Sequence, residues 1–335
     1  MFPKRGHEDS WPRIVKSQTP RGSLLGGIIM KNTLFRFLFV IPMICVLLSA
    51  AFVQANAANW YLESYWGGRG TGQGELQDPR ALAFGSNNNL YVADYGNARV
   101  QQFGADGSFI RAWGASGDAD TRFEFLKGLT VDQEGNIYVL DGRHIEKFAA
   151  DGQYLQRTDE EIFVDGFSLA ASSNNNIYTV GGGRVTIYGS DLLEVGSHEV
   201  MGCAENSYGG MAIVNDLLYM TDSHCQAVDV YSASGDRLNH WIFSGLASSF
   251  SIAESNAELF ATSPTERAIR ILSTDGIDTG RTIAIPELGG EVVYPLAVTT
   301  HDEHVYVLAG DYVLKFSKET AVQETTWTEM KEKYQ

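Results

Sequence analysis

The sequence predicts an all-β protein, a six-bladed β-propeller of four-stranded antiparallel blades that occupies residues 58–317 and is closed by the N-terminal strand 60–66. Three observations support this prediction. A short apolar segment centred on an aromatic residue occurs six times, two further motifs keep a near-constant distance from each copy, and no segment shows a sustained helical period. The 335 residues include 35 Gly but only 8 Pro, which is typical of a protein with many glycine turns.

Each repeat is anchored by an aromatic residue in an apolar run, as in the segment 89–94 around Tyr91. The anchors follow one another at intervals of 40 to 47 residues. A repeat of this size cannot bury both faces of its own sheet, whereas six repeats stacked around one axis bury them against each other. The six anchors are Tyr91, Tyr138, Tyr178, Tyr219, Phe260 and Tyr306.

Two more motifs mark the other strands of each repeat. A β-branched residue with an apolar residue three positions later follows each anchor, as at Val100 and Phe103, and a turn such as Asp106-Gly107 comes next in most copies. Asp-Gly between apolar runs favours a hairpin, because glycine adopts a positive φ at no steric cost. A run of small and apolar residues, such as 81–83, lies about ten residues before each anchor and suits a crowded innermost strand.

Ring closure is also predicted. Residues 60–66 match the outer-strand segment 109–114, but they precede the first innermost strand and so have no blade of their own to complete. The sixth repeat ends at Phe316 without a clear outer strand. We therefore expect 60–66 to complete the sixth blade, which removes most exposed strand edges. The polar tail 318–335 lies beyond the ring.

The first 57 residues differ in composition from the rest. Residues 30–57 show a short basic start, a long apolar run, and small residues at Ala55 and Ala57, which is the three-part pattern of a secretory signal peptide. We place cleavage after Ala57 and interpret residues 1–29 as a segment upstream of a true start at Met30. An uncleaved membrane anchor is the alternative, since the apolar run is just long enough to span a bilayer.

Charge and cysteine content agree with export to the periplasm or the cell exterior, with no membrane span after cleavage. Loss of residues 1–57 removes seven basic and two acidic residues, so the formal net charge changes from −16 to −21. Such a chain repels phosphate backbones, which excludes nucleic acid as a partner. Cys203 and Cys225 remain, and an even pair in an exported protein predicts one disulfide, with two buried free thiols as the alternative.

The first repeat carries the most complete set of motif residues, namely Pro79, Leu90, Tyr91, Val92, Ala93, Asp94, Asn97, Arg99, Val100, Phe103, Asp106, Gly107, Trp113 and Gly114. This set resembles the NHL repeat family, and the resemblance covers residues 60–316. It implies a six-bladed β-propeller. Later copies keep the apolar frame but lose polar positions, since Gly181 and Ala309 stand where the first copy has Asp94.

Some acidic residues recur with the repeat. Asp94, Asp141 and Asp222 each end the second strand of their unit. Such a carboxylate can face a ligand, or it can accept hydrogen bonds from backbone N–H groups and pair with a cation such as Arg99. We favour the structural role, because a residue that recurs with the repeat usually serves the repeat.

Residues that do not recur, in the loops before the innermost strands, are better candidates for binding a ligand. In a propeller these loops surround one mouth of the central channel. Cations and phenols on one rim could hold a peptide or a small anion. The candidate residues are Arg80, Lys127, Asp165, Tyr208 and Tyr294.

The sequence lacks a catalytic motif: it contains no Gly-x-Ser-x-Gly, no phosphate loop and no Cys-x-x-Cys. A zinc site needs three or four converging ligands, but only His144 and His224 occupy near-equivalent places in different repeats. Glu75, Asp78 and Asp165 are candidate calcium ligands, with a solvated acidic rim as the alternative. We therefore predict no metal and no cofactor, with calcium or zinc as the alternative.

These features favour a non-catalytic scaffold that binds a protein, a peptide or a small molecule through loops at the channel mouth. The alternative, which the resemblance implies, is a metal-assisted lyase or lactone hydrolase of the peptide-amidating-lyase or lactonase propeller type. The former enzymes use a central zinc with histidines, and the latter use calcium at the channel mouth. A surface-attached structural component is a third possibility.

Overall fold

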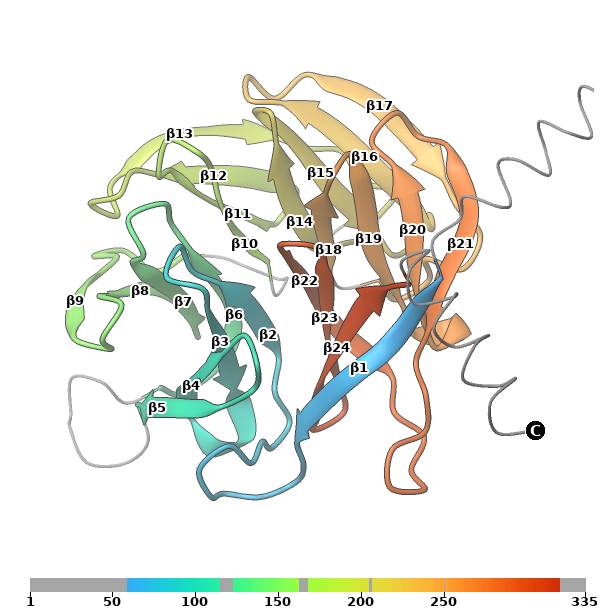
Figure 1. The fold of residues 1–335 in the computed structure, drawn as a ribbon. Coiled ribbons are helices and arrows are strands. Elements are labelled where there is room, and N and C mark those ends of the chain that lie inside the picture. Colours follow the sequence, from blue (N-terminus) through green and yellow to red (C-terminus); the bar gives the residue numbers. More distant parts are fainter. Residues whose placement is uncertain (1–58, 115–122, 163–167, 205–206, 250, 320–335) are drawn as a thin grey trace, which may run out of the picture. The chain divides into compact units, whose positions relative to one another are not determined.

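The computed structural model describes residues 59–114, 123–162, 168–204, 207–249 and 251–319. These residues form six four-stranded antiparallel sheets and two single-turn 3₁₀ helices, so the expected six-bladed β-propeller is confirmed (Figure 1). The predicted upstream segment, the predicted signal peptide and residues 320–335 of the tail lie outside the described residues. No helix in the described part of the chain is long and apolar enough to cross a membrane.

The first three blades each consist of four consecutive strands. Blade 1 contains β2 (Ala81–Phe84), β3 (Asn89–Asp94), β4 (Arg99–Gly104) and β5 (Phe109–Trp113). Blade 2 contains β6 (Leu126–Val131), β7 (Ile137–Asp141), β8 (His144–Phe148) and β9 (Tyr154–Arg157). Blade 3 contains β10 (Leu169–Ala171), β11 (Ile177–Gly181), β12 (Arg184–Tyr188) and β13 (Glu194–Glu199).

The last three blades complete the set. Blade 4 contains β14 (Tyr208–Val214), β15 (Leu217–Asp222), β16 (Ala227–Ser232) and β17 (Arg237–Ile242). Blade 5 contains β18 (Ile252–Ser255), β19 (Glu258–Ser263), β20 (Ala268–Ser273) and β21 (Asp278–Ala284). Blade 6 contains β22 (Pro295–His301), β23 (His304–Ala309), β24 (Tyr312–Lys318) and β1 (Trp60–Gly67), and the 3₁₀ helices are η1 (Tyr95–Asn97) and η2 (Pro264–Glu266).

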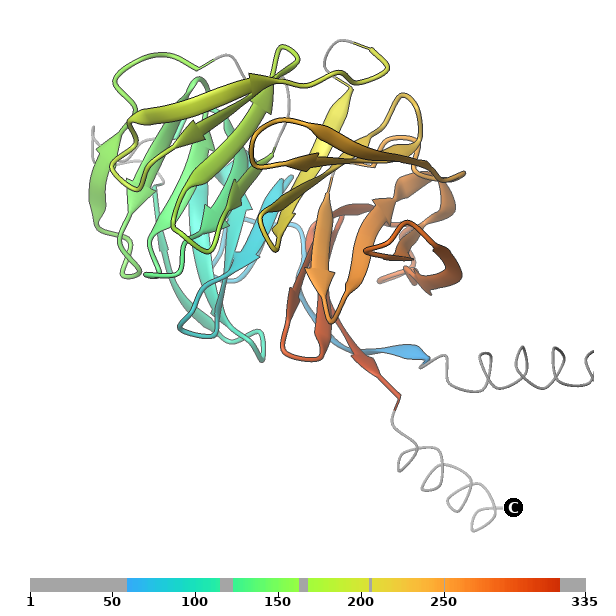
Figure 2. The ribbon, with the colours of Figure 1, turned by 90° about the horizontal axis from the view of Figure 1, so that it is seen from above.

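The blades surround a common axis (Figures 1 and 2). The innermost strands are β2, β6, β10, β14, β18 and β22, and each contacts the innermost strand of the next blade, including β22 with β2. Blade 6 has the strand order β1-β24-β23-β22, so its outer strand comes from the beginning of the described chain. The ring is thus closed by strands from the two ends of the propeller, as predicted.

The closing strand β1, blue in Figure 1, lies beside the red β24. Their antiparallel register runs from Trp60 opposite Lys318 to Gly67 opposite Tyr312. The Lys315 ammonium donates to a Glu63 carboxylate oxygen at 2.7 Å, which adds an ion pair across the two strands. The pairing extends one residue beyond the predicted segment 60–66.

The six aromatic anchors are buried, and strand register explains how each of them fits. In every blade the residue opposite the anchor, on the innermost strand, is alanine or threonine. A small side chain leaves room for the ring where six blades converge. The pairs are Ala83–Tyr91, Thr130–Tyr138, Ala170–Tyr178, Ala212–Tyr219, Ala253–Phe260 and Thr299–Tyr306.

Candidate binding site

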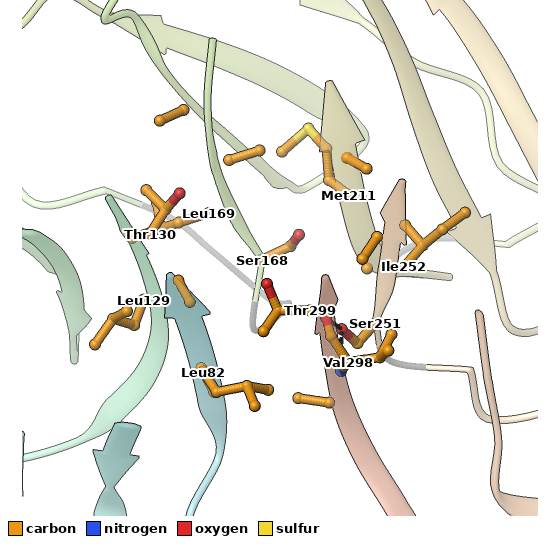
Figure 3. Close-up of a pocket in the computed structure, with 18 of the residues that line it drawn as sticks. Leu82, Leu129, Thr130, Ser168, Leu169, Met211, Ser251, Ile252, Val298 and Thr299 are labelled. Carbon is orange, nitrogen blue, oxygen red and sulfur yellow. Dashed lines mark hydrogen bonds between the residues drawn. The ribbon is translucent and has the colours of Figure 1, made fainter. Parts of the chain in front are cut away.

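The innermost strands enclose a cavity of about 430 Å³ on the propeller axis (Figure 3). All six blades contribute to its wall. Sites for small molecules usually have volumes of about 300–1,000 Å³, so this cavity is large enough for a small organic ligand.

Two sets of side chains, each with one residue per blade, line much of the cavity. The first set is the small residue opposite each anchor, and the second is the residue that directly precedes it in every blade. The second set is larger and apolar, and the close-up in Figure 3 labels all six members. They are Leu82, Leu129, Leu169, Met211, Ile252 and Val298.

Polar groups on the wall are few. The Ser251 hydroxyl donates to the Val298 carbonyl at 3.3 Å and accepts from the Val298 N–H at 3.1 Å, so it joins blade 5 to blade 6. Among the described residues that line the cavity, Arg80 is the one with an ionisable side chain. This part of the wall therefore offers apolar surface and hydroxyls, but no carboxylate or imidazole for acid–base chemistry.

Arg80 is the predicted site residue that the structure places at the cavity. It directly precedes β2, and its backbone N–H donates to the Ala93 carbonyl at 2.9 Å, which holds it against β3. The guanidinium lies 5.0 Å from the centre of the Tyr95 ring and 4.0 Å from an Asp78 carboxylate oxygen. A cation is thus held in place where the cavity wall begins.

Tyr208 lies inside blade 4 and not on the cavity wall. It is the first residue of β14 and only 7% exposed. Its hydroxyl donates to the Asp229 carboxylate at 2.8 Å and lies 3.0 Å from the Tyr231 hydroxyl. Burial, followed by these two neighbours, raises the pKa of Tyr208. The described contacts of Tyr208 are those of a structural residue.

The other three predicted residues are separated from the cavity or cannot be placed. Lys127 is half-buried in β6 and is not part of the described cavity wall. Tyr294 is 50% exposed and lines a different recess with Arg69 and Asp311. Asp165 lies outside the described residues. The structure therefore does not bring the described candidates together, and their role in binding stays a prediction.

Sequence reasoning placed the site in the mouth loops, whereas the cavity is built mainly from the innermost strands. The signal for these strands was present, because the small and apolar motif before each anchor supplies the wall. In the sequence, the composition of this motif indicates only that the strands are crowded at the axis. The sequence does not give the diameter of the ring, and without that diameter the motif cannot be recognised as the wall of a cavity.

The recurring aspartates make the backbone and ion-pair contacts that the structural role requires. Asp94 accepts the Gln77 N–H at 2.8 Å and pairs with Arg99 at 2.8 Å. Asp141 accepts the N–H groups of Glu124 and Phe125. Asp222, in turn, accepts backbone N–H groups on both sides of the disulfide, namely those of Cys203, His224 and Cys225. Each carboxylate fixes the loop that leads into its blade.

Cys203 and Cys225 form the predicted disulfide, with their Cα atoms 5.9 Å apart. The bridge joins the loop before β14 to the turn between β15 and β16, so both segments lie on one face of blade 4. In the described part of the chain, the one group of three potential metal ligands within 4.8 Å of one another is these two sulfurs with His240. Because the disulfide uses both sulfurs, this group does not support a metal centre in the oxidised protein.

The NHL repeat matches residues 76–103, which extend from the loop before β2 into β4. This match places an NHL repeat in blade 1, and together with the six four-stranded blades it supports an NHL-repeat six-bladed β-propeller. No curated protein matches the sequence.

Solved structures with a similar fold include two lyases. A streptogramin B lyase superposes with a TM-score of 0.56 and 12% identity, over 78% of this chain and 98% of that chain. Selenomethionine-substituted virginiamycin B lyase from Staphylococcus aureus superposes with a TM-score of 0.51 and 13% identity, over 70% of this chain and 79% of that chain. A catalytically inactive variant of that lyase with quinupristin superposes with a TM-score of 0.53 and 13% identity, over 74% of this chain and 82% of that chain. At such identities the likeness shows the fold alone.

Proposed function

We propose that this chain is an exported, non-catalytic binding protein that takes an apolar ligand, or an apolar side chain of a protein partner, into the axial cavity. The observation that carries the proposal is the composition of the described wall. It presents two sets of small and apolar side chains and a single ionisable residue, Arg80. Burial of apolar surface yields about 25 cal/mol per Å², so a ligand that fills this cavity gains affinity without specific chemistry.

Export is supported by two features of the chain. The segment 30–57 has the pattern of a signal peptide, and the disulfide between Cys203 and Cys225 suits an oxidising compartment. Mass spectrometry of the protein from its native host tests this part. A mature chain that begins at Ala58 supports export with cleavage, whereas a chain that retains residues 30–57 contradicts cleavage.

The cavity can be tested with the fluorescent probe 1-anilinonaphthalene-8-sulfonate, which combines aromatic rings with an anionic group. Ala171 and Ile213 are half-buried wall residues on different blades, and neither lies opposite an aromatic anchor. The substitutions Ala171→Trp and Ile213→Trp should each fill part of the cavity and weaken probe binding at least about tenfold, which corresponds to about 1.4 kcal/mol.

The matched control is Ala112→Trp, which adds the same indole to an exposed position on β5. It should leave probe affinity unchanged. Circular dichroism of all three variants checks that the propeller remains folded. Equal probe affinity in the wild type and both cavity variants would show that the probe binds elsewhere and would contradict the proposed site.

The second candidate function is that of a lyase, which the fold of the streptogramin B and virginiamycin B lyases favours. A metal-assisted lyase or lactone hydrolase of this fold would need a bound zinc or calcium. Elemental analysis of the protein purified without chelators separates the two functions. One retained zinc or calcium per chain would favour the enzyme, and a metal-free protein that still binds the probe would favour the binding protein.

A further inference from the structure

Blade 1 contains a buried guanidinium that holds the loop before β2 in place. Arg99 is the first residue of β4, and it lies opposite Asp94 in the strand register. Its Nε donates to the Asp94 carboxylate at 2.8 Å. Its other nitrogens donate to three backbone carbonyls of the preceding loop, those of Thr71, Gly72 and Glu75.

Blade 2 keeps the acid at this place but lacks the guanidinium. Asp141 corresponds to Asp94, and its register partner is His144 where blade 1 has Arg99. The His144 ring is shorter and turns away, with Nδ1 3.1 Å from the Thr158 carbonyl. A cavity of about 790 Å³ opens beside it.

This cavity, which we call the blade 2 cavity, is rich in carboxylates. Arg143 and Arg157 also line it, but Arg143 is already paired with Glu161 at 2.7 Å. The described residues of its lining are Glu124, Phe125, Asp141, Gly142, Arg143, His144, Glu146, Tyr154, Arg157 and Glu161.

Glu146 is the second and independent indication of a ligand. It lies on β8 where blade 1 has Gln101, whose side-chain amide is satisfied by the Gly74 N–H and the Glu75 carbonyl. Glu146 is only 8% exposed, and its Oε2 has no hydrogen-bond partner. Its register partner Arg157 lies near enough to lower its pKa, but the two side chains do not form an ion pair in the described structure. A buried carboxylate without a partner is costly, and a cation in the cavity would remove that cost.

We propose that the blade 2 cavity binds the guanidinium group of a small molecule or of an arginine side chain, in the place that Arg99 fills in blade 1. Asp141 and Glu146 supply the carboxylates at the base of the site. Phe125, which is 52% exposed, and Tyr154 supply aromatic rings that can face a planar cation. This site is separate from the axial cavity, and it does not depend on the function proposed for that cavity.

The charges around Glu146 predict how binding changes with pH. Burial, and then the neighbouring Asp141, raise the pKa of Glu146 to about 7, while Arg157 lowers it. Burial likewise raises the pKa of Asp141. The other charged or titratable groups of the described lining are Glu124, Arg143, His144, Tyr154 and Glu161. Because the guanidinium binds the ionised carboxylate, affinity should rise about tenfold from pH 6 to pH 8.

The test uses methylguanidinium and arginine amide as probes, with isothermal titration calorimetry of the full chain at pH 6 and pH 8. Glu146→Gln should weaken binding at least about tenfold at pH 8 and abolish the pH dependence. The matched control, Glu134→Gln, removes the same charge from the turn between β6 and β7 and should leave binding unchanged.

A second variant restores the arrangement of blade 1. His144→Arg places a guanidinium next to Asp141, so it should abolish probe binding and raise the melting temperature.

Absence of binding in the wild type, or equal affinity in Glu146→Gln and the wild type, would overturn the proposal. Preferential binding of Ca²⁺ with the same dependence on Glu146 would replace the guanidinium site with a metal site.

Discussion

The Asp94 carboxylate shows how a single buried charge organises a blade. It is fully buried, and Arg99 is its counterion. Removing one partner of a buried ion pair leaves the other charge uncompensated, which costs about 3–5 kcal/mol. We therefore expect Arg99→Ala to lower the free energy of unfolding by about this amount in urea denaturation. Arg184→Ala is the control, since its ion pair with Glu194 is about half exposed; a loss as large as that of Arg99→Ala would contradict this view.

At this scale the sequence predicted some contacts correctly and missed others for a physical reason. The pairing of Asp94 with Arg99 could be predicted, because the two residues flank one short turn. The position of Tyr208 could not be inferred, because β14 begins at that residue. Side chains of a strand alternate between its two faces, so a shift of one residue in the strand boundary moves a side chain from the mouth into the blade.

The turns between the third and fourth strands also join neighbouring blades. The Cα of Gly152, in the turn between β8 and β9, packs so closely on the Trp113 ring of blade 1 that an added Cβ would lie 2.8 Å from it. The same contact recurs between other blades. The further pairs are Gly107 with Trp66, Gly235 with His198 and Gly276 with Trp241. The sequence predicts a positive φ at such turn glycines. It does not predict the aromatic partner, because that residue belongs to another repeat.

This contact can be separated from backbone conformation by two substitutions. Gly152→Ala should cost about 3 kcal/mol, because strain at a positive φ of 86° adds to a clash with Trp113. Gly280→Ala should lower the free energy of unfolding by about 1 kcal/mol, from backbone strain alone, since its φ is 65° and no atom lies within 4 Å of the added Cβ. Denaturant midpoints of both variants provide the measurement. Equal losses would mean that the aromatic contact contributes nothing.

For the whole molecule, the number of blades, their strand order and the closing strand could be predicted, because the repeat encodes each of them locally. Anchors at near-regular intervals define the blades, and an outer-strand motif without a blade, in segment 60–66, identifies how the ring closes. The volume of the axial cavity and the blade 2 cavity could not be predicted. The axial cavity depends on the diameter of the ring, whereas the blade 2 cavity depends on how the repeats differ, as His144 and Glu146 differ from Arg99 and Gln101.

Trp66 joins the two ends of the propeller, and its removal should therefore affect the whole ring. It lies on β1 in blade 6, and its ring centre is 6.3 Å from both Phe103 of blade 1 and Tyr306 of blade 6. We expect Trp66→Ala to lower the free energy of unfolding by about 3 kcal/mol, because a large, partly buried aromatic ring that contacts two blades is lost. Tyr65→Ala, on the exposed face of the same strand, should cost no more than about 1 kcal/mol. Denaturation in guanidinium chloride measures the free energy of unfolding of both variants. If Tyr65→Ala lost as much as Trp66→Ala, strand pairing would hold the ring closed, and the contact between blades would not.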